Sequence, residues 1–279
     1  MRLAFFGGSF TAIDCDYMIE LLSSAQEFIG ENGFKGIRIS TRPDAVDGEI
    51  CDILEKYHVT AVELGAQSTN DKVLAMNRRG HTREDIFRSA RLLKERGFEL
   101  GLQMMTGLYG SNDEDSIGTA RDIISLSPDT ARIYPTVVIE NTELAELYRN
   151  GEYRPQTPEE AAVLCAKILP MFENAGIKVI RLGLHSGGDV EGSFVAGAYH
   201  PALREMCEGH IYFDIINKAL SGKEKGKYII YVAPREVSKA SGQRRCNIEK
   251  LRELGYECKI KESAALSARD ITLEKVNLL

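Results

Sequence analysis

Polar side chains suited to ligand binding follow short apolar segments in this sequence. Gln67 and Ser68 come directly after the apolar run 61–65, and Arg79 lies in a cationic corner at 77–81. Arginine holds a carboxylate through a forked pair of hydrogen bonds, although Arg79 alone can equally be read as a cation at a helix end. Polar residues just past the carboxyl end of a strand line the ligand site in barrels and open α/β sheets. This stretch therefore predicts a small-molecule site.

Other candidate residues share this placement, at or just after the end of a strand-like apolar segment. They are Gly7, Gly8, Ser9, Ser40 and Gln103. Glycine lacks a Cβ, so a glycine turn lets the backbone approach a ligand, although a plain turn is an equally good reading. A buried glutamine such as Gln103 must form hydrogen bonds to protein or ligand. Each residue is a weak signal alone, and the prediction rests on their shared position after successive strands.

The elements that must position these residues alternate between strand and helix. The expected strands are 2–6, 36–40, 61–64, 98–104, 131–134 and 177–182. The expected helices are 15–29, 46–57, 82–96, 116–126 and 158–175. Such alternation implies βαβ units and a parallel sheet, and an incomplete α/β barrel fits best. Beyond it we expect a glycine-rich loop, a helix through residue 206, and a β-α-β tail formed by 228–233, 246–254 and 256–262.

Composition sets the broad class of the protein. With 279 residues, 43% of them hydrophobic, the chain can bury one sizeable core and a small appendage. Nothing resembles a signal peptide or a membrane-spanning helix, so we expect a cytoplasmic protein with no membrane partner. The formal charge of −6 does not favour nucleic-acid binding, yet residues 223–261 hold eleven Lys or Arg against five Glu. That basic tail is either a solvated face or a site for a polyanion.

Metal and nucleophile motifs are not found. No two of the six cysteines lie closer than twelve positions, which excludes CxxC, zinc-ribbon and ferredoxin spacings. The sequence also has no HExxH, P-loop, GxGxxG or GxSxG pattern. We expect no metal ligands in this chain and mostly reduced core cysteines, and the sequence identifies no catalytic residue.

Five segments, in order, carry a family resemblance. They are AFFGGSF, IRISTRPD, ELGAQSTNDKVLAMNRRGHT, GLQMMTGL and RIYPTVVIENTELAELYRNGEY. Together they resemble the radical S-adenosylmethionine (SAM) enzymes over residues 2–185. The resemblance is strongest to the radical-SAM half of the Elongator catalytic subunit and to proteins related to oxygen-independent coproporphyrinogen oxidase. It implies a partial (βα)6 TIM-like barrel, SAM, a [4Fe–4S] cluster, and an electron donor such as ferredoxin or flavodoxin.

The resemblance also implies a cofactor-binding set. Its members are Gly7, Gly8, Ser9, Ser40, Gln67, Ser68, Arg79 and Gln103. The glycine pair matches the backbone that meets the SAM amino group, and Arg79 matches the arginine that pairs with the SAM carboxylate. Gln103 takes the place of a ribose-binding residue that is often Asp in the family.

One departure from the family is large. Its cluster is held by three cysteines of a CxxxCxxC loop ahead of the glycine pair, whereas this chain begins six residues before that pair. We therefore expect residues 1–185 to form a barrel without its first strand and cluster loop, and residues 186–279 to form a small α+β extension. Either the gene start is placed too late, or the protein is a true fragment.

Three functions remain open from the sequence. The first is a radical SAM enzyme, or the major part of one, acting on an unknown substrate, with transfer RNA as one candidate. The second is a non-catalytic barrel that binds an adenosyl ligand without a cluster. The third, an ordinary acid–base barrel enzyme, is disfavoured because no carboxylate or histidine pair converges at the strand ends apart from Glu63.

Overall fold

The computed structural model describes residues 1–6, 8–184 and 192–276. The chain divides into two compact units. The first unit comprises Met1–Gln156 and Ile168–Ala198, and the second comprises Thr157–Lys167 and Tyr199–Leu279. The domain boundary expected at residue 185, like Gly7, lies outside the described residues.

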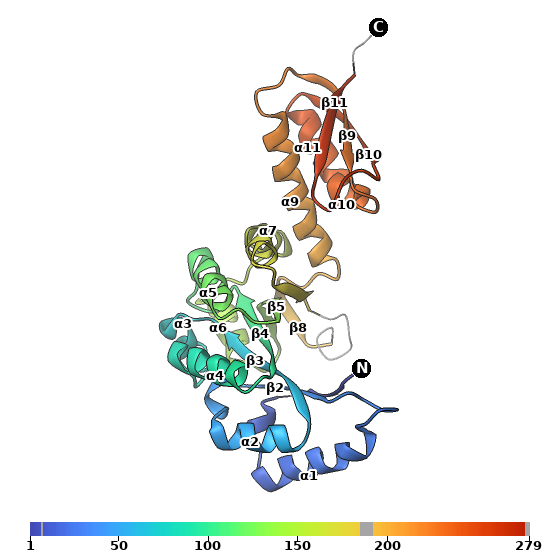
Figure 1. Ribbon diagram of the computed structural model, residues 1–279. Coiled ribbons are helices and arrows are strands. Elements are labelled where there is room, and N and C mark those ends of the chain that lie inside the picture. The colour runs from blue at the N-terminus through green and yellow to red at the C-terminus, as the bar shows by residue number, and fades with distance from the viewer. Residues whose placement is uncertain (7, 185–191, 277–279) are drawn as a thin grey trace. The chain divides into compact units, whose positions relative to one another are not determined.

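The first unit is built on a curled parallel sheet (Figure 1). Within the described residues its strands run in the order β1-β2-β3-β4-β5-β7, and every neighbouring pair is parallel. They are β1 (Leu3–Phe5), β2 (Ile37–Thr41), β3 (Val59–Gln67), β4 (Glu99–Thr106), β5 (Thr130–Pro135) and β7 (Lys178–Leu182). The expected partial TIM-like barrel is confirmed.

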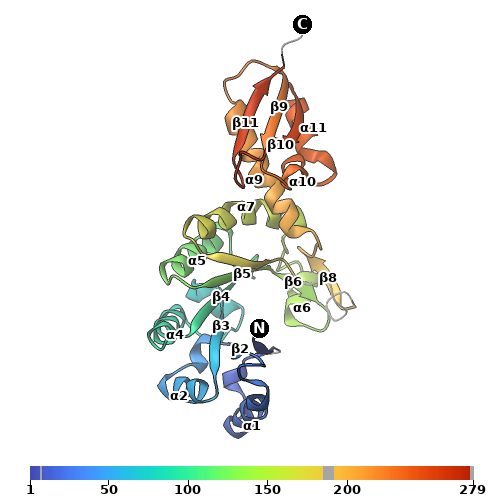
Figure 2. The ribbon, with the colours of Figure 1, turned by 45° about the vertical axis from the view of Figure 1, so that its right-hand side comes forward.

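Helices alternate with these strands. They are α1 (Cys15–Ala25), α2 (Gly48–Lys56), α3 (Asp71–Met76), α4 (Arg83–Glu95), α5 (Asp113–Ser125), α6 (Glu143–Arg149) and α7 (Pro158–Asn174). Helices α2, α4 and α5 pack on the outer side of the sheet (Figure 2). Thr82 and Asp85 form a capping box at the start of α4, and Asn112 and Asp115 form another at α5. These boxes satisfy free amide groups of the first turn and fix where each helix begins.

Some short elements were not predicted. Strand β6 (Val137–Ile139) pairs antiparallel with β8 (Phe194–Gly197), so part of the expected glycine-rich loop is a strand. Short 3-10 helices occur at Phe10–Ala12, Gln26–Phe28, Pro43–Ala45 and Gln243–Arg245. These elements have only three or four residues each, which is at most two repeats of the two-residue strand period and about one turn of a 3-10 helix. Such short segments do not show a periodic apolar pattern in the sequence.

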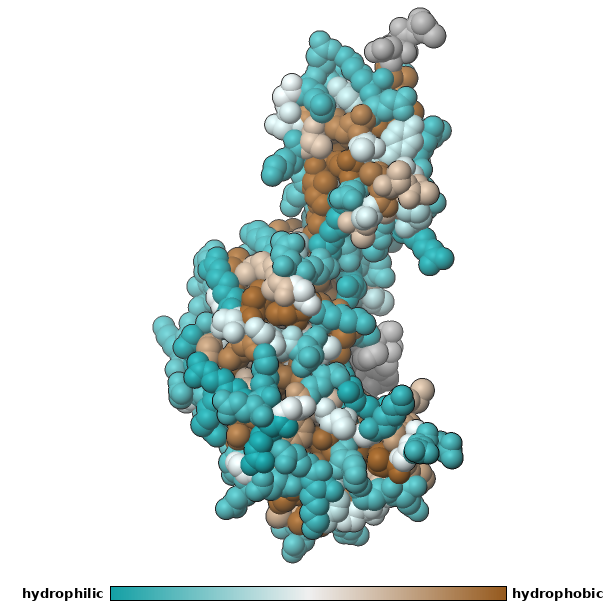
Figure 3. All heavy atoms as spheres, in the orientation of Figure 1, coloured by the Kyte–Doolittle hydropathy of each residue, from teal (hydrophilic) through white to brown (hydrophobic). Residues whose placement is uncertain are grey.

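The second unit contains a small sheet and helices. Its elements are α9 (Leu203–Leu220), β9 (Gly226–Val232), α10 (Val237–Ser241), α11 (Cys246–Glu253), β10 (Tyr256–Glu262) and β11 (Ile271–Lys275). Strand β9 is central, with β10 parallel and β11 antiparallel to it. The core includes Tyr212, Ile216 and Ile230, and apolar residues gather in a strip on the visible face of this unit (Figure 3). The expected α+β extension is confirmed, although α9 is longer than predicted and β11 was missed.

Among the described helices, none combines the length and apolar character needed to cross a membrane.

Candidate functional site

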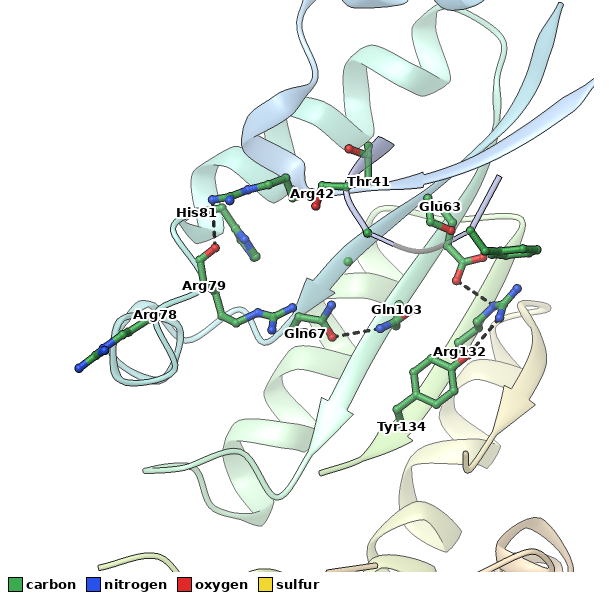
Figure 4. A pocket seen from close by; sticks show the side chains of 15 residues that line it. Thr41, Arg42, Glu63, Gln67, Arg78, Arg79, His81, Gln103, Arg132 and Tyr134 are labelled. Carbon is green, nitrogen blue, oxygen red and sulfur yellow. Dashed lines mark hydrogen bonds and ion pairs between the residues drawn. The ribbon is translucent and has the colours of Figure 1, made fainter. Parts of the chain in front are cut away.

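A cavity of about 540 Å³ lies at the carboxyl ends of the parallel strands. Residues after β1 and at the ends of β2, β3, β4 and β5 line it, as parallel-strand topology requires (Figure 4). The lining is Phe6, Gly8, Ser9, Ser40, Thr41, Arg42, Glu63, Gly65, Gln67, Arg78, Arg79, His81, Gln103, Arg132 and Tyr134. Polar groups therefore dominate this cavity.

A β-bulge at the end of β3 positions Gln67. The register between β3 and β4 shifts at Gly65/Gln67, and Gln67 has a φ of 64°, which is uncommon for a residue with a side chain. A Cβ on Gly65 would lie 2.6 Å from the Gln67 amide nitrogen, so glycine makes room for that side chain. The Gln103 amide donates to Gln67 Oε1 at 3.3 Å, and the His81 ring lies 3.1 Å from the Ala66 carbonyl. The bulge thus places the Gln67 side chain beside that of Gln103 on β4.

Charged side chains from β2, β3 and β5 form a triad, of which Glu63 and Arg132 line the cavity. The buried carboxylate of Glu63 lies 2.7 Å from Arg38 Nη2 and 2.8 Å from Arg132 Nε. The Arg132 guanidinium also donates to the Tyr134 hydroxyl at 3.0 Å. A Cβ on Gly101 would lie 3.3 Å from both Arg38 and Glu63, so glycine on β4 leaves space for the triad. Pairing offsets the cost of burying these ions.

Arg79 differs from the other arginines of the cavity. Arg42, Arg78 and Arg132 have partners in Asp44, Glu143 and Glu63, at 2.6, 2.7 and 2.8 Å. No carboxylate pairs with Arg79 anywhere in the described ranges. Its guanidinium points into the cavity toward Gln67, whereas Arg78 points away (Figure 4). Burial, and secondarily repulsion from Arg42, lowers the pKa of Arg79. An anionic group would relieve both effects.

The backbone around Arg79 is held from the neighbouring loop. Arg42 Nη2 donates to the Arg79 carbonyl at 3.1 Å while its Nε binds Asp44. Gly80 follows with a φ of 76°, and a Cβ there would clash with the Arg42 guanidinium. Arg42 therefore supports the loop that carries Arg79.

The structure brings most of the predicted site residues together. Gly8, Ser9, Ser40, Gln67, Arg79 and Gln103 all line the cavity. Ser68 does not: its buried hydroxyl accepts from the Asn70 amide at 3.1 Å and lies 3.5 Å from Thr119 Oγ1. The triad of Arg38, Glu63 and Arg132 was not foreseen as a unit. The sequence feature that could have indicated it is the single charged residue within each of three apolar strand segments.

A second cavity of about 500 Å³ adjoins the first and shares Arg78 and Arg79 with it. Its other lining residues are Met76, Asn77, Met105, Leu108, Tyr109, Thr136, Val137, Glu143, Leu144 and Leu147. Most of these side chains are apolar. The two cavities together suit a ligand with one charged end and one flat, weakly polar end.

The cysteines do not form a cluster site. All six, which lie within the described ranges, are free thiols. Cys51, Cys165 and Cys207 are buried as expected, whereas Cys15 is exposed at the start of α1. In the part of the chain that the structure describes, no group of three or more His, Cys, Asp or Glu could hold a metal ion. The described residues therefore do not supply the set of thiolates that an iron–sulfur cluster requires.

Comparison with known families accounts for this geometry. The profile of the Radical SAM superfamily matches residues 2–123, and that of the Radical SAM C-terminal domain matches residues 128–212. The chain belongs to the radical SAM superfamily. The cavity of this radical SAM protein lies at the strand ends that the sequence resemblance indicated.

Individual relatives agree with this assignment. A protein named tRNA uridine(34) acetyltransferase from Methanocaldococcus jannaschii is 33% identical over 181 residues, which are 58% of this chain and 34% of that protein. The solved Elp3 of Methanocaldococcus infernus, lacking its N-terminus, aligns with a TM-score of 0.64 and 27% identity, covering 78% of this chain and 54% of that one.

A more distant structure shares the fold. Coproporphyrinogen III oxidase (HemN) of Escherichia coli aligns with a TM-score of 0.52 and 18% identity, covering 63% and 40% of the two chains. The chain spans about a third of the length of the first curated relatives it matches. Both predicted likenesses, to Elongator-type and coproporphyrinogen-oxidase-type proteins, are confirmed.

Proposed function

We propose that this chain is the SAM-binding part of a radical SAM enzyme, with the methionyl end of SAM in the polar cavity. The main support is that Arg79, alone among the arginines lining this cavity, lacks a carboxylate partner among the described residues. Its forked donors would take the SAM carboxylate. Gly8, with a φ of 123°, leaves its backbone open toward the cavity for the amino group.

The adjoining apolar cavity would take the adenine ring. Met105, Leu108 and Val137 offer aliphatic and thioether surface for a flat base. Gln67 and Gln103 lie between strand ends where the ribose hydroxyls need partners, and their amide groups both donate and accept. In this arrangement the first cavity would form the polar contacts with SAM, and the second would form the dispersion contacts.

The matched pair Arg79→Ala and Arg78→Ala tests this assignment. Losing a hydrogen-bonded charge pair costs about 2 kcal/mol, which corresponds to roughly a 30-fold loss of SAM affinity for Arg79→Ala. Arg78→Ala removes the same charge from an exposed side chain that pairs with Glu143, so its affinity should stay within about twofold. Isothermal titration with SAM measures both. Equal affinities for the two variants would refute the carboxylate assignment.

A [4Fe–4S] cluster would supply the electron for the cleavage of SAM into methionine and a 5′-deoxyadenosyl radical. Three thiolates for it must come from outside the described site, since the cysteines here do not converge. This chain's residues would orient SAM and exclude water around it. A donor such as ferredoxin or flavodoxin would be the electron source.

A second candidate is an adenosyl-binding barrel without a cluster of its own, favoured by the cysteine positions. Anaerobic reconstitution of this chain with iron and sulfide tests whether its own cysteines can hold a cluster. We expect SAM binding without the visible absorbance of an iron–sulfur cluster. A retained [4Fe–4S] signal in this chain alone would contradict our reading of its cysteines.

We further propose a base of transfer RNA as the substrate class. Support comes from the name of the tRNA uridine(34) acetyltransferase relative, and from the basic tail. A base seated beside SAM must couple the two affinities, by about fivefold or more. SAM titrations with an anticodon stem-loop carrying uridine at position 34, against one carrying cytidine there, measure this coupling. Identical SAM affinities in both would exclude a base-specific site.

A further inference from the structure

A cation-rich groove lies along strand β10 in the second unit. Its volume is about 570 Å³, and β9, β10 and the start of α11 form it. The lining is Lys227, Tyr228, Ile229, Arg245, Ile248, Arg252, Glu257, Cys258, Lys259, Lys261 and Val276. It has no residue in common with the SAM cavity.

The charges of this groove are largely uncompensated. Lys227 lies 3.4 Å from Glu257, the acidic residue of the lining. The cations that lack a carboxylate partner in the described ranges are Arg245, Arg252, Lys259 and Lys261. All four are exposed. Neighbouring positive charges repel one another, so they favour an occupant that carries several negative charges.

Strand geometry sets the spacing of the lysines. Lys259 and Lys261 are two positions apart on β10, so they share a face and lie about 6.6 Å apart along the strand. Strand β10 is an edge strand of this sheet, so no other strand of the described residues pairs with its outer side. Such a row matches the regular charge of a phosphodiester backbone.

The same face offers a surface for bases. In the register of β10 with β9, Lys259 lies beside Ile229 and Lys261 lies beside Tyr231. Tyr231 is half-buried, and its hydroxyl donates to Glu274 at 2.7 Å, which fixes the ring on the sheet. Single-stranded nucleic acids bind where a basic groove follows the backbone and an aromatic ring stacks a base.

We propose that this groove binds the backbone of a single-stranded nucleic acid. The inference deepens the transfer-RNA proposal but does not depend on SAM binding. Each phosphate neutralised on a single strand contributes about −0.7 to the slope of log affinity against log salt, so four cations predict a slope of about −2.8. A folded RNA would present such a strand in a loop.

The test is fluorescence anisotropy of a labelled twelve-nucleotide oligouridylate with the full chain, without SAM, at several salt concentrations. The variant Lys259→Gln/Lys261→Gln should lose about 1.4 from the slope and bind about 25-fold more weakly at 0.1 M salt. Lys218→Gln/Lys223→Gln removes two charges outside the groove lining and should bind within about twofold of the parent chain. Lys259→Arg/Lys261→Arg keeps the charge and should retain binding, which would show that the positive charge at these positions is what binding requires.

Two outcomes would overturn the proposal. One is equal weakening by both glutamine pairs, which would show diffuse attraction rather than a groove. The other is displacement of oligouridylate by polyglutamate of equal charge at equal concentration, which would show a site for acidic peptides. Measuring Arg79→Ala in parallel separates the proposals, because it should lose SAM affinity while keeping oligouridylate affinity.

Discussion

Replacing Glu63 by glutamine should destabilise the first unit more than any surface substitution would. The carboxylate is 4% exposed, and its partners Arg38 and Arg132 are 17% and 18% exposed. Glutamine keeps the shape but leaves two largely buried guanidinium groups without a counter-charge. Breaking a buried ion pair from one side costs about 3–5 kcal/mol, a large share of the roughly 5–15 kcal/mol of a typical domain.

Urea unfolding followed by circular dichroism measures this loss, because the chain has no tryptophan for fluorescence. With a slope of about 2 kcal/mol per molar, a loss of about 4 kcal/mol moves the midpoint of the first unit down by about 2 M. The midpoint of the second unit should not move, since it contributes no residue to the triad.

A triple variant, Arg38→Met/Glu63→Leu/Arg132→Met, is the matched control. It removes all the buried charges together, and buried ion triads can be replaced by apolar residues with little loss of stability. We expect the triple variant to be more stable than Glu63→Gln. A Glu63→Gln midpoint within about 0.5 M of the parent chain would refute the claim that Glu63 neutralises buried arginines.

Four further predictions concern other parts of the chain. Gly242→Ala should lower the urea midpoint more than Gly222→Ala, because both have a φ near 75° but only the Cβ at 242 would meet neighbouring atoms, the nearest at 2.6 Å. Thr82→Ala should cost about 1 kcal/mol in the same assay through loss of the α4 cap. At pH 8 a thiol reagent should modify exposed Cys15 quickly and Cys165 only on unfolding, since burial raises the Cys165 pKa to about 12. That raised pKa also predicts stability falling as pH rises above about 9, by up to 1.4 kcal/mol per pH unit, in alkaline unfolding curves.

The barrel could be predicted because its signals are local and repeated. Each parallel strand is an apolar run ended by glycine or a polar residue, and α4 and α5 begin with capping residues that the sequence displays. Parallel topology then brings the strand ends to one edge, which is why six of the eight predicted cofactor residues line one cavity. Neither inference needed knowledge of side-chain packing.

What could not be predicted depends on register and backbone detail. Ser68 follows the same strand as Gln67, but the bulge at Gly65/Gln67 turns Gln67 to the cavity and leaves Ser68 to bind Asn70. The Glu63 triad forms only when β2, β3 and β5 have the right register relative to one another. Strand β11 was missed because it has only five residues, two of which are charged. Such features arise from long-range pairing, which a local pattern does not encode.

The electrostatics of the cavity connect stability to ligand binding. The fold neutralises Arg132 with Glu63 and Arg42 with Asp44, yet leaves Arg79 to bear both burial and repulsion from Arg42. A ligand carboxylate at Arg79 would remove that cost only in the bound state, so it adds to affinity and to stability together. At a ligand concentration of a hundred times Kd the gain is about 2.7 kcal/mol, which is comparable to the expected loss from Glu63→Gln. SAM should therefore raise the stability of Glu63→Gln by about this amount and that of Arg79→Ala much less, because only the first variant keeps the group that the ligand neutralises.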